Sequence, residues 1–253
     1  EDNEVNQLLA KRMLAKLGCI VEIAENGQVA IDAAKSSHFD LLFMDCQMPK
    51  VDGYAATRSI RALPSPVCDL PIVAMTANAM QGDREKCLDA GMDDYISKPV
   101  TIQAIRSIVQ RVANRELAHK ENGVSDSEPA AQRVSEAIDL IGLRELCAQD
   151  SDLVVDLLNV LHSALPELQS ELNLAFDAAP RSADACVKAA HSLKGALLSA
   201  NATQAAEVAK HMEINCREGR LEEANAWRRE LEQALAELEA SLPRYLDLFA
   251  NSR

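Results

Sequence analysis

The sequence has few aromatic residues, no long apolar run and no excess of positive charge. Aromatic residues make up only 3% of its 253 residues, so any hydrophobic core must be built mainly from Leu, Ile, Val, Ala and Met. No apolar stretch approaches the roughly 20 residues that span a bilayer, so we expect no membrane contact by this segment. The formal net charge of -13 argues against a nucleic-acid partner, because binding nucleic acid needs a basic surface.

The seven cysteines also lack a recognisable pattern. None stands in a Cys-x-x-Cys pair, which disfavours a zinc cluster. An odd number of scattered cysteines indicates reduced thiols, mostly buried, so we expect a cytoplasmic protein. With 48% hydrophobic residues, the chain is long enough for two ordinary domains that each bury a core.

Residues 1–113 alternate between helical and strand patterns. The patterns predict helices over 4–17, 27–36, 53–62, 83–90 and 101–113, and strands over 20–24, 40–45, 71–75 and 94–97. Strands that alternate with helices pair in parallel, which predicts an α/β doubly wound parallel sheet. Ligands of such sheets bind at the carboxyl ends of the strands, where Asp45, Thr76 and Lys98 are expected to meet.

The sequence changes character after residue 113. Residues 114–135 are polar with little periodicity, and we interpret them as a linker. Beyond them the strand patterns vanish, and five leucines between Leu157 and Leu172 mark one face of a helix. Further helices are predicted over 182–200, 203–218 and 221–249, so residues 136–250 are expected to form an all-α antiparallel four-helix bundle.

Three acidic residues, Glu1, Asp2 and Asp45, are expected at the ends of neighbouring strands. Crowded carboxylates repel one another unless a cation joins them, and Mg²⁺ favours one or two carboxylates together with phosphate oxygens. Lys98 could neutralise a transferred phosphoryl group, and the hydroxyl of Thr76 could donate to the same oxygens. Phosphoryl transfer needs an aligned nucleophile, a metal and positive charge, and Asp45 would be that nucleophile through an aspartyl phosphate.

The order and spacing of these motifs resemble those of the receiver domains of response regulators and hybrid sensor kinases. The matching segments are Glu1-Asp2-Asn3, Met44-Asp45-Cys46-Gln47-Met48-Pro49, Asp52-Gly53, Ala74-Met75-Thr76-Ala77, Gly91-Met92-Asp93-Asp94-Tyr95 and Lys98-Pro99. The resemblance covers residues 1–113 and implies a flavodoxin-like fold in which Asp45 is the phosphoacceptor.

The same resemblance implies roles for the residues around Asp45. The Mg²⁺ ligands that it implies are Asp2, Asp45, the backbone carbonyl of Gln47 and, through water, Glu1. Thr76 and Tyr95 would form a switch pair, in which Thr76 moves toward the phosphoryl group and Tyr95 repacks behind it. Lys98 would pair with the phosphate.

Receiver domains normally begin with an apolar strand, in the middle of the sheet, just before the acidic pair. Here the sequence starts at Glu1, so we expect the first strand to be missing and the sheet to expose unpaired edges. The family resemblance then suggests the C-terminal part of a hybrid sensor histidine kinase. Its expected partners are an upstream histidine kinase core in the same parent chain and the receiver of a downstream response regulator.

A second motif, Ala190-His191-Ser192-Leu193-Lys194-Gly195, lies in a predicted bundle helix. Helical spacing places His191, Lys194 and Gly195 on a stripe that is more exposed than the core face. There a ring nitrogen of His191 could attack a phosphoryl group, and Lys194 could balance its charge. Gly195 costs the helix about 1 kcal/mol relative to Ala, but would let a partner's active site approach. Residues 136–250 resemble the histidine phosphotransfer (HPt) domains, in which this histidine is phosphorylated.

Together the two motifs predict a phosphorelay in which phosphate arrives at Asp45, moves to His191 and leaves to a separate receiver. No ATP-binding glycine boxes are present, so these residues cannot make phosphohistidine from ATP. A haloacid-dehalogenase-like hydrolase also uses an aspartyl nucleophile and Mg²⁺, but it needs a second acid where Gln47 stands. A receiver that only binds partners stays open. A flavin-binding domain is disfavoured, because a phosphate-cradling loop rich in Gly, Ser and Thr is lacking.

Overall fold

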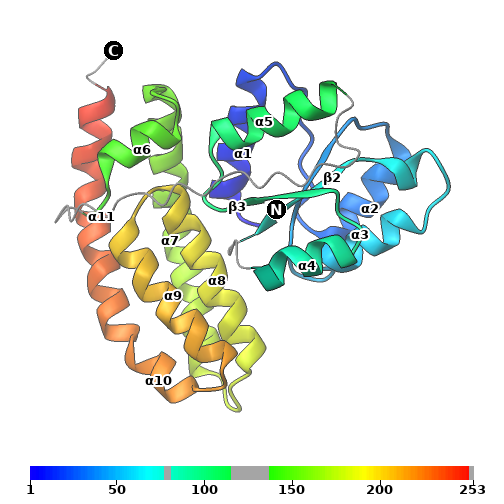
Figure 1. The fold of residues 1–253 in the computed structure, drawn as a ribbon. Coiled ribbons are helices and arrows are strands. Elements are labelled where there is room, and N and C mark those ends of the chain that lie inside the picture. The colour runs from blue at the N-terminus through cyan, green and yellow to red at the C-terminus, as the bar shows by residue number, and fades with distance from the viewer. Residues whose placement is uncertain (77–80, 115–136, 251–253) are drawn as a thin grey trace. The chain divides into compact units, whose positions relative to one another are not determined.

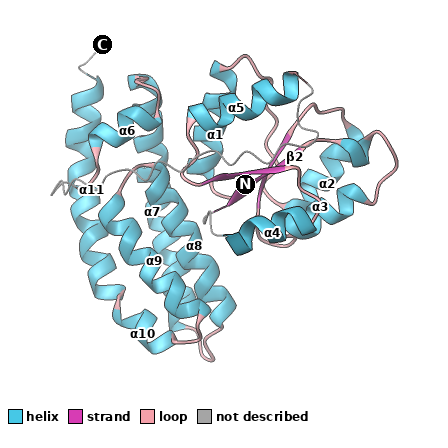
Figure 2. Cartoon of the chain, in the orientation of Figure 1, coloured by secondary structure: helices cyan, strands magenta, loops and turns pink. Residues whose placement is uncertain are grey.

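The computed structural model describes residues 1–76, 81–114 and 137–250 (Figure 1). The described residues divide into two units: residues 1–2 and 10–114 form one, and residues 3–9 and 137–250 form the other. Strands among the described residues occur only in the first unit, which we call the α/β unit, and the second is the helical unit (Figure 2). Apart from Asn114, the predicted linker lies outside the described residues.

From residue 27 onward, the elements up to residue 114 alternate between helix and strand as the sequence predicts. In chain order they are α1 (Glu4–Lys16), α2 (Gly27–Ser36), β1 (Leu42–Asp45), α3 (Gly53–Arg61), the 3-10 turn η1 (Val67–Asp69), β2 (Ile72–Thr76), α4 (Gln81–Asp89), β3 (Asp94–Ser97) and α5 (Ile102–Ala113). Short polar side chains begin several of these helices by accepting backbone N–H groups of the first turn. These N-caps are Asn26 for α2, Asp52 for α3 and Thr101 for α5.

The three strands form a parallel sheet in the order β1-β2-β3. Its register pairs Asp45 with Met75 and Thr76 with Ser97, so the carboxyl ends of all three strands lie at one edge. Asp45 ends β1, Thr76 ends β2, and Lys98 directly follows β3. The predicted parallel α/β sheet is therefore confirmed, and it brings the three strand-end residues to the same edge.

The strand predicted over residues 20–24 is wrong. These residues adopt no regular structure, and the side chain of Ile20 is fully exposed. A strand is stabilised by the ladder of hydrogen bonds to its neighbour. Among the described residues, β1 pairs only with β2, and no strand lies beside residues 20–24 to complete a ladder with them.

The sheet has helices on both sides, with α5 on one side and α4 on the other (Figure 1). One hydrophobic cluster joins sheet residues to α2, α3 and α4. Its members include Met44, Ile72, Ala74, Ala30, Ile31, Ala56, Ile60 and Cys87. The alternate sheet residues Val73 and Met75 are also buried, as are three isoleucines of α5 at helical spacing, from Ile102 to Ile108. Burial on both faces explains why β2 is apolar up to its last residue, Thr76.

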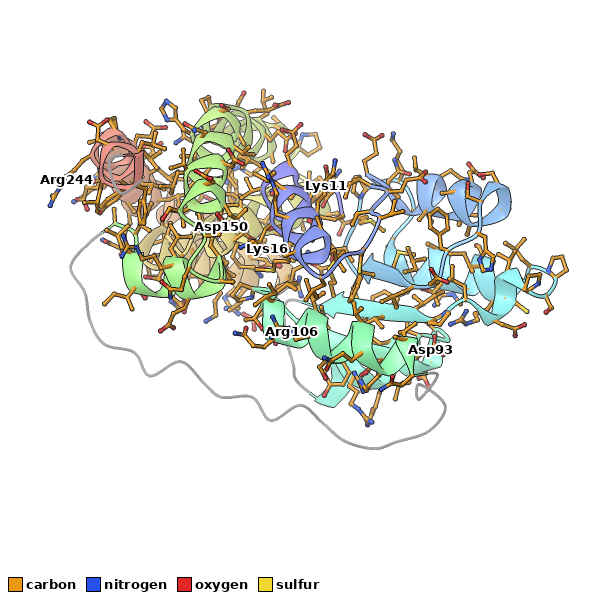
Figure 3. All side chains as sticks on the ribbon, turned by 90° about the horizontal axis from the view of Figure 1, so that it is seen from above. Lys11, Lys16, Asp93, Arg106, Asp150 and Arg244 are labelled. Carbon is orange, nitrogen blue, oxygen red and sulfur yellow. The ribbon has the colours of Figure 1, made fainter. Side chains whose placement is uncertain are left out.

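One arginine forms a hydrogen-bond network at the amino ends of the strands in the α/β unit. Arg61, at the end of α3, donates to the backbone carbonyls of Cys68, Leu70 and Gly91 at 2.7–2.8 Å. It also donates to Asp93 Oδ2 at 2.7 Å, and the same carboxylate oxygen accepts the N–H of Ile72 at the start of β2. Asp93, labelled in Figure 3, comes directly before β3, so this network lies at the amino ends of the strands.

The helical unit contains α6 (Leu140–Leu146), α7 (Ser151–Asp177), α8 (Ala183–Ser199), α9 (Thr203–Arg217), α10 (Leu221–Ala226) and α11 (Arg228–Ala250). The four long helices form a closed bundle: α7 and α9 each pack against both α8 and α11. Most of the predicted leucine stripe, including Leu157, Leu161 and Leu165, is fully buried on α7. The predicted bundle is therefore confirmed.

Two details of the bundle differ from the sequence prediction. The sequence prediction contains no separate helix at the position of α6, and the helix predicted over 221–249 is two helices, α10 and α11. The break falls at Trp227, whose ring stacks on that of His211 from α9, with centroids 4.9 Å apart. No helix among the described residues is both long enough and apolar enough to cross a membrane.

Candidate functional site

The carboxyl end of the sheet carries a cluster of three acidic side chains. Glu1, Asp2 and Asp45 each offer a carboxylate oxygen, and these atoms lie within 4.8 Å of one another. Asp45 is only 3% exposed, and its Oδ1 accepts the backbone N–H of Gln47 at 3.1 Å. A side chain at Gly53 would not fit here, because its Cβ would lie 2.1 Å from the carbonyl oxygen of Asp45. The start of α3 therefore packs tightly against the end of β1.

Lys98 provides positive charge to this acidic cluster. Its Nζ donates to Asp45 Oδ2 at 2.8 Å and to Glu1 Oε2 at 2.7 Å. Its position is fixed by the sheet, because its backbone N–H donates to the carbonyl of Thr76 at 2.8 Å, directly beyond the paired ends of β2 and β3. The four side chains, when all are ionised, carry three negative charges and one positive charge.

The protonation of the cluster reflects this excess of negative charge. Burial, together with the charges of Glu1 and Asp45, raises the pKa of Asp2 to about 6. Burial also raises the pKa of Asp45, although Lys98 opposes this effect. Burial alone would lower the pKa of Lys98, but the two neighbouring carboxylates outweigh it and raise that pKa. Oxygen ligands and an excess of two negative charges suit a divalent cation.

The other three predicted receiver residues differ in how they lie relative to this cluster. Thr76 is buried at the end of β2, the strand next to β1. Gln47 meets Asp45 through its backbone N–H. Tyr95 lies further back on β3, in register with Ala74, and packs half-buried against the hydrophobic cluster of α2, α3 and α4.

A second polar cluster lies between α8 and α9 of the helical unit. His191 of α8 and Glu213 of α9 approach to 2.8 Å between Nδ1 and Oε1. Lys194, one turn further along α8, donates from Nζ to Glu213 Oε2 at 2.5 Å. Arg217, one turn along α9, donates from Nη2 to Glu213 Oε1 at 2.6 Å. We call these four residues the histidine cluster.

Glu213 is ionised in this setting. Burial would raise its pKa, but the hydrogen bond and charge of His191 and the ammonium of Lys194 outweigh it and lower the pKa to about 2. An ionised carboxylate only accepts hydrogen bonds, so Nδ1 of His191 must carry the proton. In the neutral form of the ring, the lone pair then lies on Nε2.

The helical motif differs from its prediction in one respect. Lys194 was expected on an exposed stripe, but it is buried, because its ammonium forms an ion pair with Glu213. His191 and Gly195 are half-buried, as a stripe beside the core would be. The neighbours expected on the core face, such as Ala190 and Leu193, are fully buried.

Sequence reasoning missed Glu213 and Arg217. Their spacing of four residues predicts a helical ion pair, but nothing local indicates that α9 presents them to His191. The remaining histidines have no comparable setting. His38 and His162 are exposed, His211 stacks on Trp227, and His119 lies outside the described residues.

Comparison with known proteins agrees with both predicted domain types. The family model of the response regulator receiver domain matches residues 1–110, and that of the Hpt domain matches residues 156–241. Sensor protein GacS of Pseudomonas syringae pv. syringae is 34% identical over 208 residues, which cover 78% of this chain and 22% of that protein. The signal transduction histidine-protein kinase BarA of Escherichia coli K12 is 32% identical over 180 residues, 68% of this chain and 19% of that one.

A solved structure also resembles the first part of the chain. The receiver domain of sensor histidine kinase PA1611 from Pseudomonas aeruginosa PAO1, solved with magnesium in its active-site cleft, is 46% identical. The match covers 45% of this chain and 93% of that one, with a TM-score of 0.43.

The fold and the matched families define a protein of two-component phosphorelay signalling. The chain consists of a receiver domain followed by an Hpt domain. It spans between 15% and 22% of the length of the first three curated relatives that it matches.

Proposed function

We propose that Asp45 accepts a phosphoryl group from an upstream histidine kinase core and that His191 then receives it from Asp45. His191 passes it to the receiver of a downstream response regulator. The observation that carries the proposal is the cluster around Asp45, in which two further carboxylates and the Lys98 ammonium surround a buried strand-end aspartate. This is the arrangement of nucleophile, cation site and positive charge that phosphoryl transfer needs.

Mg²⁺ fits this site, because the donors are hard oxygens and their charge is left two units negative. Its proposed ligands are Asp2, Asp45, the backbone carbonyl of Gln47 and, through water, Glu1. The bound ion would neutralise charge on the oxygens of the transferring phosphoryl group.

Each receiver residue has a separate role in the first transfer. The N–H of Gln47 orients the Asp45 carboxylate, so that one of its oxygens can attack the phosphorus of a phosphohistidine. The O–P bond forms as the N–P bond breaks, and the imidazole leaves with the electron pair. Lys98 then moves from Asp45 to the phosphoryl oxygens, where the Thr76 hydroxyl also donates. Tyr95 repacks behind Thr76 as the switch residue.

The histidine cluster prepares His191 for the second transfer. Glu213 holds the proton on Nδ1, which leaves the lone pair of Nε2 to attack the phosphorus of the aspartyl phosphate. The N–P bond forms, the acyl O–P bond breaks, and Asp45 is released as a carboxylate. Lys194 supports the transfer by keeping Glu213 ionised and in place, while Gly195 leaves room for the incoming receiver.

Intact-mass measurement tests the first step. Incubation with acetyl phosphate and Mg²⁺ should add at least one phosphoryl group, and Asp45→Asn should abolish this uptake. Asp40→Asn, at an exposed acid where the second predicted strand begins, should change nothing and serves as the control. Uptake that persists in Asp45→Asn would contradict the assignment, and no uptake by the folded wild-type chain would favour a receiver that only binds partners.

The second step is tested by transfer to a separate receiver. His191→Gln should keep the uptake at Asp45 but block onward transfer, whereas His162→Gln, at an exposed histidine of α7, should transfer normally. Continued transfer by His191→Gln would remove His191 from the relay. A cytoplasmic setting is part of the same proposal and is supported by the seven cysteines, all of which are free thiols.

A further inference from the structure

The two cations of the histidine cluster are held differently. Lys194 is 9% exposed and binds Glu213 Oε2 at 2.5 Å, inside the interface of α8 and α9. Arg217 is 40% exposed and binds the other oxygen, Oε1, at 2.6 Å. Lys194 is therefore enclosed with the buried carboxylate, while the Arg217 side chain is partly exposed to solvent.

Arg217 also lies beside the reactive ring. His191 Nδ1 and Arg217 Nη2 both donate to the same oxygen of Glu213, so the guanidinium and the imidazole are neighbours. A guanidinium has five N–H donors, and its planar fork matches the oxygens of a phosphoryl group. Arg217 can thus bind a phosphoryl group on His191 without leaving the cluster.

Charge balance supports the same assignment. Before transfer, the side chains of Glu213, Lys194 and Arg217, with a neutral His191, carry a net charge of one positive unit. Transfer to Nε2 adds two negative charges on the phosphoryl group and leaves one positive charge on the ring, since Nδ1 keeps its proton. The phosphorylated cluster is then neutral, and without Arg217 it would be left with one uncompensated negative charge.

We propose that Arg217 is the phosphate-binding cation of the His191 site, turning from Glu213 to the phosphoryl oxygens when Nε2 is phosphorylated. Glu213 stays bound to Lys194 and to the N–H of Nδ1. This inference rests on the proposed phosphorylation of His191, and it gives to Arg217 the contact with phosphate that the sequence motif suggests for Lys194.

A small P–N donor tests the site apart from the receiver. Phosphoramidate can transfer its phosphoryl group to His191 directly: the Nε2–P bond forms, the donor's N–P bond breaks, and ammonia leaves. In the full chain carrying Asp45→Asn, so that only the histidine can be loaded, uptake is followed by intact mass. His191→Gln should abolish uptake altogether, and if it does not, the proposed function itself fails.

Arg217→Gln should slow uptake by roughly tenfold, as expected for loss of a charge-assisted contact made in the transition state. Arg217→Lys, which keeps the charge but not the fork, should recover part of the rate. The matched control is Arg220→Gln, because Arg220 is 44% exposed near the same helix end but pairs with Glu223 instead. A rate for Arg217→Gln equal to that of Arg220→Gln would overturn the proposal.

A double variant separates phosphate binding from support of the carboxylate. If Arg217 served only to neutralise Glu213, then Glu213→Gln/Arg217→Gln should regain the rate of Glu213→Gln alone. If Arg217 binds the phosphoryl group, the double variant should stay roughly tenfold slower than Glu213→Gln. Regained activity would therefore overturn the proposal even though His191 still takes up phosphate.

Discussion

Replacement of Glu213 by Ala should strongly destabilise the helical unit. The Glu213 side chain is 4% exposed and binds one buried cation, Lys194, and two more accessible groups, His191 and Arg217. His191 and Arg217 can turn toward water when the carboxylate is removed. Lys194 is left as an unpaired ammonium between α8 and α9.

The magnitude follows from this difference in accessibility. Removal of one partner from a buried ion pair typically costs 3–5 kcal/mol, because the other charge stays buried without compensation. Since two of the three partners can rehydrate, we expect the lower end, about 3 kcal/mol. Glu207→Ala is the control, because its pair with Lys210 on α9 is exposed and should be worth less than about 0.5 kcal/mol.

Urea unfolding followed by tryptophan fluorescence measures the effect in the full chain. Trp227 is the single tryptophan; it lies between α10 and α11 and stacks on His211 of α9, so its signal reports on the helical unit alone. The double variant Glu213→Leu/Lys194→Met should recover most of the lost free energy, because an apolar pair needs no charge compensation. A loss below about 1 kcal/mol for Glu213→Ala would refute the buried ion pair as the stabilising feature.

Three further predictions use the same logic. The pKa of Glu213 is lowered from 4.5 to about 2, so its contribution to stability is complete above pH 4.5 and is lost as the pH falls toward 2. The urea concentration at the midpoint of the Trp227 signal should therefore decrease between pH 4.5 and pH 2, and should decrease less in Glu213→Gln. Arg61→Ala should cost the α/β unit about 2 kcal/mol by leaving partly buried carbonyls without donors. Arg58→Ala, at an exposed arginine of the same helix, should be near neutral, and hydrogen exchange of the β2 amides should show a loss of protection only in Arg61→Ala. Chelation of Mg²⁺ should block uptake from acetyl phosphate at Asp45 and leave uptake from phosphoramidate at His191 unchanged; equal loss at both, by intact mass, would contradict the proposed metal site.

The elements that depend on local sequence could be predicted from it. Helix α2 and strand β3 have the predicted bounds, because caps and apolar periodicity are properties of neighbouring residues. The strand over residues 20–24 could not be judged in this way. Its composition is that of a strand, but a strand also needs a partner, and none of the described strands pairs with it.

The two candidate sites show the same difference between what local sequence predicts and what depends on packing between elements. Asp45, Thr76 and Lys98 could be placed together from sequence, because parallel strands end at one edge and the register brings those ends level. Glu213 and Arg217 could not, because they reach His191 only through the packing of α8 against α9. For the same reason Lys194 was expected in solvent: its burial depends on a carboxylate from another helix.

The two sites handle the charge of a phosphoryl group in opposite ways. When ionised, the side chains of Asp45, Glu1, Asp2 and Lys98 together carry an excess of two negative charges, so a dianionic phosphoryl group can enter only with additional positive charge. The histidine cluster already holds one excess positive charge and gains another when the ring becomes an imidazolium. Under the proposed function, a divalent cation would therefore be needed at the aspartate but not at the histidine. Because the helical unit would compensate this charge with its own residues, we expect a phosphoryl group on His191 to be held there without a metal until a second receiver accepts it.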